Sequence, residues 1–438
     1  MISPQRRDEV VDALRRGTVP RAGLGELAVG LDRFEATIDE ELGRVRRGGS
    51  LFKAIRGEYG SGKTFFVRWL AERAKGAGFV TSEVQISEGE TPLHRLETVY
   101  RRIAERLSTS EEESGAFRSV VDRWFYGLEE AAIDAGEAAE SDEAALSAAT
   151  EVRLERRLGE VSSVAPAFAS ALRGYRRAMQ AGDLAQAEAL LAWAGGQPNV
   201  AAAAKRYAGI RGDLDHFGAL AFLRGLTDLA REAGHAGMVV VLDEVETLQR
   251  VRSDVRERAL NALRQLIDEL DAGRFPGLAV VITGTQAFFE GPQGIRRLPP
   301  LAQRLHVDFG PDARFDNPRA PQVRLASFDV DALTQVGRRV REVYAAGAAD
   351  ADRVRGVVDD ALIADLARGV AGELGGQVGV APRLFLRKLV ADVLDRVELF
   401  EDFVPRRDYE LIVSESELSE VERGARAVAD PDSVDLSG

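Results

Sequence analysis

The sequence predicts an α/β protein with a parallel-sheet core, a large all-helical insert and a small C-terminal helical lid. Apolar runs of strand length recur along the chain, and the first leads through a glycine-rich loop into a helix and a second strand. A strand–loop–helix–strand unit of this kind is typical of a parallel sheet. Residues 108–234, in contrast, keep a helical pattern without a convincing strand, which predicts the insert.

Short apolar runs predict the strands, because a strand that is buried on both faces reads as a continuous hydrophobic segment. The run before Asp243 is the clearest example, and a shorter, mostly apolar run precedes the glycine loop. The expected strands are residues 51–56, 79–86, 238–242, 278–283 and 322–325, with a small final strand at 408–413.

Helical spacing of apolar residues predicts the remaining elements. Leu31, Phe34, Ile38 and Leu42, for example, recur at intervals of three and four residues and so share one helix face. Outside the insert, the expected helices are residues 8–15, 31–46, 65–74, 93–107, 255–270, 330–345, 359–371 and 383–399. Glycine and proline divide the insert into several helices.

These elements divide the chain into successive parts. Residues 1–107 are an N-terminal segment and the first part of the core, 108–234 the helical insert, 235–325 the second part of the core and 326–413 the lid. Residues 414–438 are charged and end in glycine and serine, so we expect a disordered tail. The insert is long enough to be a folding unit of its own.

Composition excludes several classes of protein. The 438 residues include no cysteine, which rules out disulfides, cysteine-ligated zinc, iron–sulfur clusters and a thiol nucleophile. A formal net charge of −13 makes a general nucleic-acid coat a poor candidate. No segment approaches the ~20 apolar residues of a membrane span, and the first residues lack the apolar run of a secretory signal. We therefore expect a cytoplasmic protein without a membrane contact.

The glycine-rich loop fits the phosphate-binding pattern G-x-x-x-x-G-K-[ST] without a mismatch. Its residues are Gly57, Glu58, Tyr59, Gly60, Ser61, Gly62, Lys63 and Thr64. Backbone N–H groups of such a loop surround phosphates, Lys63 reaches the β and γ phosphates, and the Thr64 hydroxyl ligates Mg²⁺. Lys63 is one of only five lysines in the chain, which favours this interpretation over a flexible turn. The sequence thus predicts a P-loop ATPase core that binds ATP and Mg²⁺.

The buried strand at 238–242 ends in two carboxylates, Asp243 and Glu244. We expect Asp243 to hold Mg²⁺ through its water shell, and Glu244 to orient and deprotonate the attacking water. The alternative is that the two acids cap the following helix or face solvent. Glu246 extends the acidic cluster, and no role is predicted for it.

Hydroxyl side chains stand at the end of the strand at 278–283. In additional-strand ATPases, a polar residue at this place lies between the attacking water and the γ-phosphate. Thr283 or Thr285 would fill the position here. The alternative is an ordinary turn of threonine and glycine after a strand.

Two arginines stand where oligomeric ATPases of this class use them. Arg304 is placed to reach the γ-phosphate of a neighbouring copy, and Arg296 and Arg297 compete for that role. Arg383, in the first turn of a helix, has the position of a second sensor in the lid. A cation is unfavourable at a helix N-terminus, which favours a bound anion beside it. The alternative in each case is an ordinary surface arginine.

Several stretches resemble the BREX-system ATP-binding proteins of the BrxD type, which are AAA+-like components of bacterial phage-defence clusters. These stretches are residues 28–34, 56–64, 85–87, 242–248 and 379–385. The resemblance extends from about residue 6 to about residue 413 and includes the insert. It implies ATP binding within a multi-protein complex, and it carries over to Lys63, Thr64, Asp243 and Glu244.

We therefore expect an ATP-hydrolysing subunit of a BREX-type defence complex. The alternative is a nucleotide-gated interaction protein that binds ATP, hydrolyses it rarely and recruits partners through the insert. A small-molecule phosphotransferase ranks below both because it needs no lytic glutamate, and the lack of an N-K-x-D tetrad disfavours a GTPase. The expected partners are other BREX-type proteins, DNA only indirectly, and further copies of this chain.

Two more expectations concern surfaces. Adenine would lie between residues 18–20 and 29–30, where aliphatic side chains can sandwich its ring. Arginines on two insert helices could meet phosphates or acidic partners, although the acidic chain favours solvated faces beside glutamates. These arginines are Arg153, Arg156, Arg157, Arg173, Arg176 and Arg177.

Overall fold

A six-stranded sheet forms the centre of the protein in the computed structural model, which describes residues 2–429 apart from 377, 378 and 380. The strands are β1 (Leu51–Arg56), β2 (Val80–Gln85), β3 (Leu107–Ser108), β4 (Met238–Asp243), β5 (Leu278–Gly284) and β6 (Gln322–Arg324). They lie in the order β3-β2-β4-β5-β1-β6, and of these described strands only β3 runs antiparallel to its neighbour. The expected α/β class with a largely parallel sheet is confirmed.

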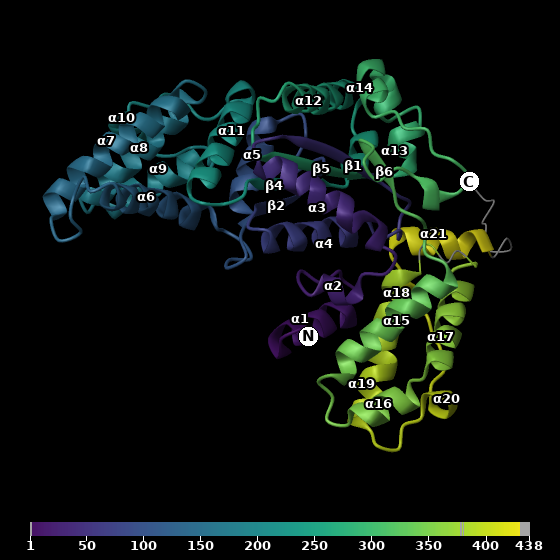
Figure 1. Cartoon of the computed structure of the whole chain (residues 1–438). Coiled ribbons are helices and arrows are strands. Elements are labelled where there is room, and N and C mark those ends of the chain that lie inside the picture. The colour runs from purple at the N-terminus through teal and green to yellow at the C-terminus, as the bar shows by residue number, and fades with distance from the viewer. Residues whose placement is uncertain (1, 377–378, 380, 430–438) are drawn as a thin grey trace.

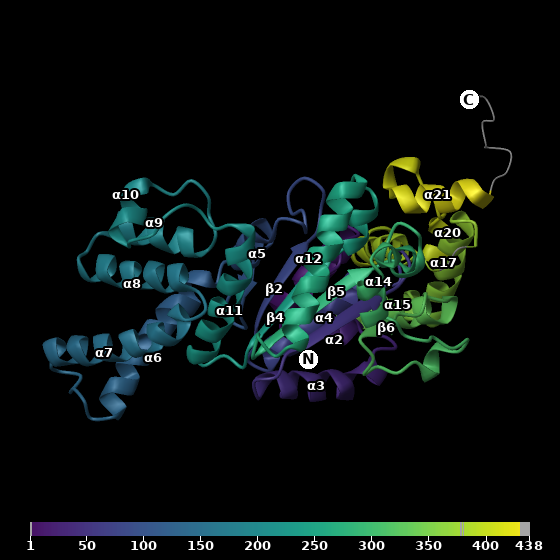
Figure 2. The same ribbon diagram turned by 90° about the horizontal axis from the view of Figure 1, so that it is seen from above.

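Helices cover both faces of the sheet (Figures 1 and 2). Alternate residues of β4 pack into different cores: Val239 and Val241 face one layer, and Val240 and Leu242 face the other. The first layer is α3 (Asp32–Arg46) and α4 (Lys63–Gly76), and the second is α5 (Leu96–Glu105), α11 (His216–Glu232) and α12 (Ser253–Asp271). Because both faces are covered, β4 is buried throughout and reads as an unbroken apolar run.

The register of the parallel strands brings polar residues together at one edge of the sheet. Gln85 at the end of β2 pairs with Asp243 at the end of β4. Leu242 pairs with Ile282, so the next residue of β5, Thr283, lies beside this edge. Strand β1 ends beside the end of β5, and the glycine loop therefore leaves the sheet at the same edge.

The insert extends from one end of the sheet (Figure 1). Its helices are α6 (Phe117–Asp134), α7 (Glu143–Ser162), α8 (Pro166–Gln180), α9 (Leu184–Ala194) and α10 (Ala202–Tyr207), followed by α11. The Tyr100 hydroxyl of α5 donates to the Ala194 carbonyl (2.8 Å), and its ring packs edge-on against Phe222 of α11 (5.6 Å between centroids). One hydrophobic core therefore runs from the sheet into the insert.

The lid lies at the other end of the molecule and has a core of its own (Figure 1). It consists of α15 (Val330–Ala345), α16 (Ala351–Val357), α17 (Asp360–Glu373), α18 (Pro382–Arg387), a π-helical segment (Lys388–Leu394), α19 (Asp395–Leu399) and α20 (Pro405–Asp408). The N-terminal helix α1 (Pro4–Arg15) and the short α2 (Leu24–Leu27) pack against it. Two short helices, α13 (Gln286–Glu290) and α14 (Pro299–Arg304), come between β5 and β6 along the chain, and α14 lies beside α12 (Figure 1).

Three local expectations differ from the structure. The expected strand at 408–413 is wrong: Asp408 ends α20 and the following residues pair with no strand, although Val413 is buried in the lid core. The expected helix at 93–107 is shorter, because Leu107 leaves it to pair with β2. The tail, expected to be disordered, forms a turn at Glu415–Glu417 and helix α21 (Glu420–Ala429), while residues 430–438 lie outside the described residues.

Across the part of the chain that the structure describes, no helix is both long enough and apolar enough to cross a membrane.

Candidate functional site

The glycine loop joins β1 to α4, and three of its residues leave no room for a side chain or need a backbone that glycine favours. Gly60 and Gly62 have φ angles of 80° and 85°, in the left-handed region. A Cβ at Gly57 would lie 2.2 Å from the Ser61 hydroxyl oxygen. That hydroxyl is itself buried and has no hydrogen-bond partner among the described residues. The loop thus offers a tight backbone curve with an unsatisfied polar group inside it.

Lys63, the first residue of α4, folds back onto this loop. Its Nζ donates to the carbonyls of Gly57 (2.9 Å) and Glu58 (3.1 Å) and lies 3.9 Å from a carboxylate oxygen of Glu246. Burial lowers the pKa of Lys63, although the nearby carboxylates oppose this shift. The ammonium is therefore a buried cation whose present partners are mostly neutral carbonyls, and an anion would stabilise it further.

Asp243 receives two hydroxyl donors at the sheet edge. Thr64 Oγ1 donates to Asp243 Oδ2 (3.1 Å), and Thr283 Oγ1 donates to Asp243 Oδ1. The structure thus places the two predicted magnesium ligands, Thr64 and Asp243, in direct contact. Within the described ranges no three His, Asp or Glu side chains gather as a metal cluster. One carboxylate and one hydroxyl suit Mg²⁺, which takes its other ligands from water and phosphate.

Glu244 turns sharply out of β4 and lines the adjoining pocket. Its φ and ψ of 58° and 44° lie in the left-handed region, which costs a non-glycine residue ~1–2 kcal/mol. Two contacts hold it: its N–H donates to Thr283 Oγ1 (2.9 Å), and its Oε2 accepts from Gln85 Nε2 (2.8 Å). Strained backbone of this kind concentrates at functional sites, where surrounding structure maintains it.

The structure distinguishes the two threonines at the end of β5. Thr283 is fully buried and joins Asp243 to the backbone of Glu244. Thr285 instead caps α13, its hydroxyl accepting from the Phe288 N–H (3.4 Å). Thr283 is therefore the residue at the position predicted for a polar sensor.

Two residues of this site were not predicted from the sequence. Gln85 had no assigned role, although it belongs to the resembling stretch 85–87 and stands at the carboxyl end of a strand beside Asp243. Glu246 is buried, and neither of its carboxylate oxygens has a hydrogen bond. Burial raises the pKa of Glu246 to about 7, although Lys63 opposes the shift. The signal available in the sequence was that Glu246 comes three residues after Asp243 and so belongs to the same acidic cluster.

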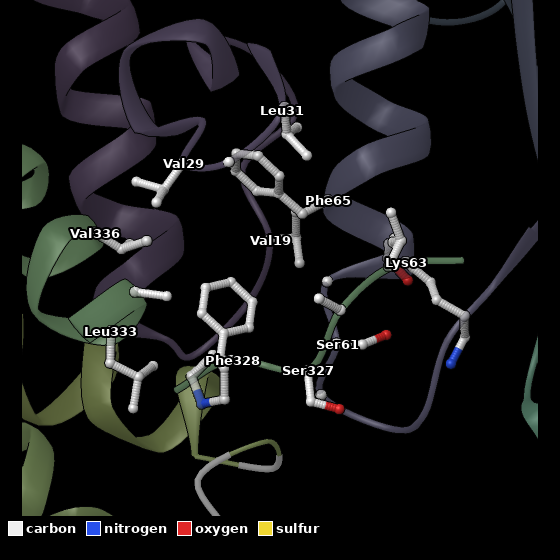
Figure 3. Close-up of a pocket in the computed structure, with 18 of the residues that line it drawn as sticks. Val19, Val29, Leu31, Ser61, Lys63, Phe65, Ser327, Phe328, Leu333 and Val336 are labelled. Atoms are coloured by element: carbon white, nitrogen blue, oxygen red, sulfur yellow. The ribbon is translucent and has the colours of Figure 1, made fainter. Parts of the chain in front are cut away.

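A pocket of about 650 Å³ opens beside the glycine loop. Figure 3 shows apolar side chains around it, with the Ser61 and Ser327 hydroxyls to one side and the Lys63 amino group pointing away from the apolar cluster. The apolar lining includes Val19, Val29, Leu31, Phe65, Phe328, Leu333 and Val336. Residues 18–20, Val29 and Gly30, where adenine was expected, are also part of the lining.

The predicted arginines occupy different surroundings. Arg383 lines the same pocket from the first turn of α18. Val380, which belongs to the same sequence motif, lies outside the described residues. Arg304 ends α14, where its Nε lies 2.5 Å from Asp268 Oδ1 of α12, and it is not part of the pocket lining. The competitors Arg296 and Arg297 lie outside that lining too. The structure therefore brings one predicted arginine to the pocket.

Insert arginines pair within the chain. Arg153 contacts Glu137, Arg173 contacts Glu155, and Arg176 contacts Glu129. Arg157 lies 3.9 Å from Glu232, and Arg177 donates to the Tyr207 carbonyl (3.2 Å). These contacts favour the alternative of solvated faces beside glutamates over a phosphate-binding surface.

The comparison with protein families returns one description that covers nearly the whole chain: residues 2–413 match the family "BREX system ATP-binding protein BrxC/D". The chain belongs to this family. The expected resemblance is confirmed, with the family described as ATP-binding. Comparisons with curated proteins and with solved structures give no match. The BrxC/D match includes the glycine loop, the acidic sheet edge, the insert and the lid, and it ends before helix α21.

Proposed function

We propose that this protein binds and hydrolyses ATP as a subunit of a bacterial BREX-type phage-defence complex, and that its sheet is a P-loop ATPase core. One observation carries the proposal: Lys63, Thr64 and Glu244 line a pocket that also has an apolar compartment, and Asp243 contacts Thr64 beside it. A nucleotide has the same two halves, an anionic triphosphate and a flat base. Membership of the BrxC/D family supports ATP as that nucleotide.

The phosphates would bind in the glycine loop. Its N–H groups and the positive end of α4 favour anions, and Lys63 would exchange its bonds to loop carbonyls for charged phosphate oxygens. Thr64 and Asp243 would hold Mg²⁺, giving up the hydrogen bond between them. When bound, Mg²⁺ supplies positive charge that neutralises the phosphate oxygens.

Glu244 is the proposed general base. Its side chain lines the pocket directly after Asp243, and its carboxylate can accept a proton from a water beside the terminal phosphate. Thr283 fixes the backbone of Glu244, and Gln85 holds one of its carboxylate oxygens. These two contacts orient the base before substrate arrives, which is how positioned groups lower a reaction barrier.

Adenine is proposed to fill the apolar compartment. Val19 and Val29 come from the N-terminal segment, and Phe65 comes from α4. Phe328 and Leu333 come from the junction with the lid, so bound nucleotide would contact both parts of the molecule. This arrangement can couple the state of the nucleotide to the position of the lid.

A nucleotide-gated interaction protein is the second candidate. In the first candidate the hydrogen bond from Gln85 orients Glu244; in this second one it would instead hold the carboxylate back from the attacking water, and hydrolysis would stay slow until the contact is released. In either case, we propose other BREX proteins as partners, with DNA acting only indirectly. An assembly of several copies would need Arg304 to leave Asp268 before it could reach a neighbour's nucleotide.

Steady-state ATP turnover by the purified chain, with and without duplex DNA, tests the proposal. Lys63→Ala should lose most nucleotide binding. Glu244→Gln should bind Mg·ATP normally and turn over at least ~100-fold more slowly, the loss expected when a general base is removed. Glu257→Gln, an exposed change on α12, is the matched control and should behave as wild type.

Two outcomes would contradict hydrolysis by this site. If Glu244→Gln turns over as fast as wild type, Glu244 is not the base. If wild type binds Mg·ATP and does not turn it over under either condition, the interaction protein is the better description.

A further inference from the structure

The C-terminal helix α21 contacts the one predicted arginine that lines the pocket. Arg383 donates from Nε to Glu422 Oε1 (3.1 Å) and from Nη2 to Glu422 Oε2. Glu422 has only 2% of its surface exposed, although it comes from a segment that would read as a charged tail. The family match ends at residue 413, so this contact comes from a part of the chain beyond it.

Glu422 is held in place by more than the arginine. The Ser419 N–H donates to Glu422 Oε2 (2.7 Å), and the Glu422 N–H bonds back to the Ser419 hydroxyl (3.3 Å). Just before it, Leu418 packs into the lid core and Glu417 accepts from Lys388 Nζ (2.9 and 3.1 Å). The carboxylate is therefore anchored to the lid independently of Arg383.

The contact also determines which edge of the guanidinium remains free. A two-point contact between a carboxylate and a guanidinium fixes the plane of the guanidinium. Here Nε and Nη2 are engaged, and Nη2 also donates to the Glu417 carbonyl (2.5 Å). Nη1 lies beside Gly17, which also lines the pocket: a Cβ added at Gly17 would be 3.3 Å from Arg383 Nη1.

We propose that Glu422 is a positioning residue that holds Arg383 ready for the terminal phosphate of bound ATP. The proposal rests on the proposed function of the pocket. The other role for such a carboxylate is competition, in which ATP would pull Arg383 away. Competition is disfavoured because it would leave a buried carboxylate whose other hydrogen-bond donor is the Ser419 N–H.

Equilibrium binding of Mg·ATP and Mg·ADP to the full chain tests this role without requiring hydrolysis. Glu422→Gln should weaken ATP binding about tenfold and leave ADP binding within about twofold, because only ATP has the terminal phosphate. The double variant with Arg383→Ala should bind ATP no more weakly than Arg383→Ala alone. Arg426→Ala is the matched control, since Arg426 ties α21 to Glu373 (3.3 Å) without touching Arg383.

Arg383→Lys provides a second variant if Glu422→Gln does not fold. It keeps the charge and loses the two-point contact, so it should show the same selective loss for ATP. The proposal is overturned if Glu422→Gln binds ATP more tightly than wild type, or if it loses affinity for ATP and ADP equally. It is also overturned if Arg383→Lys keeps the wild-type ratio of ATP affinity to ADP affinity. Wild type that binds neither nucleotide would overturn both this role and the proposed function. Binding without turnover would contradict hydrolysis alone.

Discussion

At the scale of single residues, burial is the main influence on the charges of the site. Lys63 and Glu246 are opposite charges 3.9 Å apart, yet the pKa of each shifts towards its neutral form. The loss of water around each group outweighs their attraction, as is usual for buried pairs that lack direct hydrogen bonds. The site therefore stores an unfavourable charge arrangement that bound phosphate and metal would alter.

The raised pKa of Glu246 predicts a pH dependence of stability. The folded protein keeps a proton up to about pH 7 that the unfolded chain releases from about pH 4.5, so stability falls as pH rises between these values. The full loss is ~3 kcal/mol at ~1.4 kcal/mol per unit of pKa. Glu246→Gln should remove this loss, which urea unfolding at pH 5, 6, 7 and 8 would measure. Parallel stability profiles for wild type and variant would contradict the raised pKa.

At the scale of elements, one feature is the junction of a strand, a glycine loop and a helix. The loop enters α4 through residues with positive φ angles, and Gly62, the residue directly before the helix, is one of them. The same helix ends in Gly76, which does not have a positive φ, and a Cβ at this position would meet no other atom within 4 Å. The glycine before α4 and the glycine that ends it thus have opposite requirements.

Gly62→Ala should destabilise the protein by ~1–2 kcal/mol, the cost of a left-handed backbone for alanine, and should weaken nucleotide binding. Gly76→Ala, at the other end of α4, is the control. It should be neutral or stabilise by up to ~1 kcal/mol, because alanine is the better helix former. Thermal unfolding and nucleotide titration measure both effects. Equal behaviour of the two variants would show that the loop does not need its glycine conformation.

At the scale of the whole molecule, the insert is continuous with the sheet. Helices α5 and α11 cover a sheet face and also contact α6 and α9, and the Trp124 indole of α6 donates to Glu232 of α11 (2.8 Å). The lid, in contrast, packs around a second core. From its length alone, the insert could be a folding unit of its own. The hydrophobic core that it shares with the sheet predicts that it is not.

The shared core predicts that sheet and insert unfold together. Trp69 reports on the sheet from α4, whereas Trp124 and Trp193 report on the insert. Two variants that each keep one tryptophan, Trp69 or Trp124, and replace the other two by phenylalanine should give coincident urea midpoints by fluorescence. The two variants are matched in the number of replacements. Circular dichroism would measure the overall stability of each variant. If the two fluorescence midpoints still differ after correction for that stability, the insert unfolds independently.

The sequence by itself determined the parts of this protein whose cause is local. Strands β4 and β5 are continuous apolar runs up to their polar ends because both faces of the sheet are covered. The loop at 57–64 carries its glycines because its own backbone needs them. The sequence also placed Asp243 at the end of one strand and Thr283 or Thr285 at the end of another. Parallel strands bring their carboxyl ends to one edge.

Only the tertiary structure decided which distant residues complete the site. Gln85 reaches Glu244, and Glu422 reaches Arg383, across separations that no local pattern records. The tail was expected to be disordered because charges usually remain in water, and here its residues Glu422 and Glu417 pair with Arg383 and Lys388 of the lid. Spacing and periodicity describe neighbours along one element, whereas partners brought together by packing of separate elements depend on the whole fold.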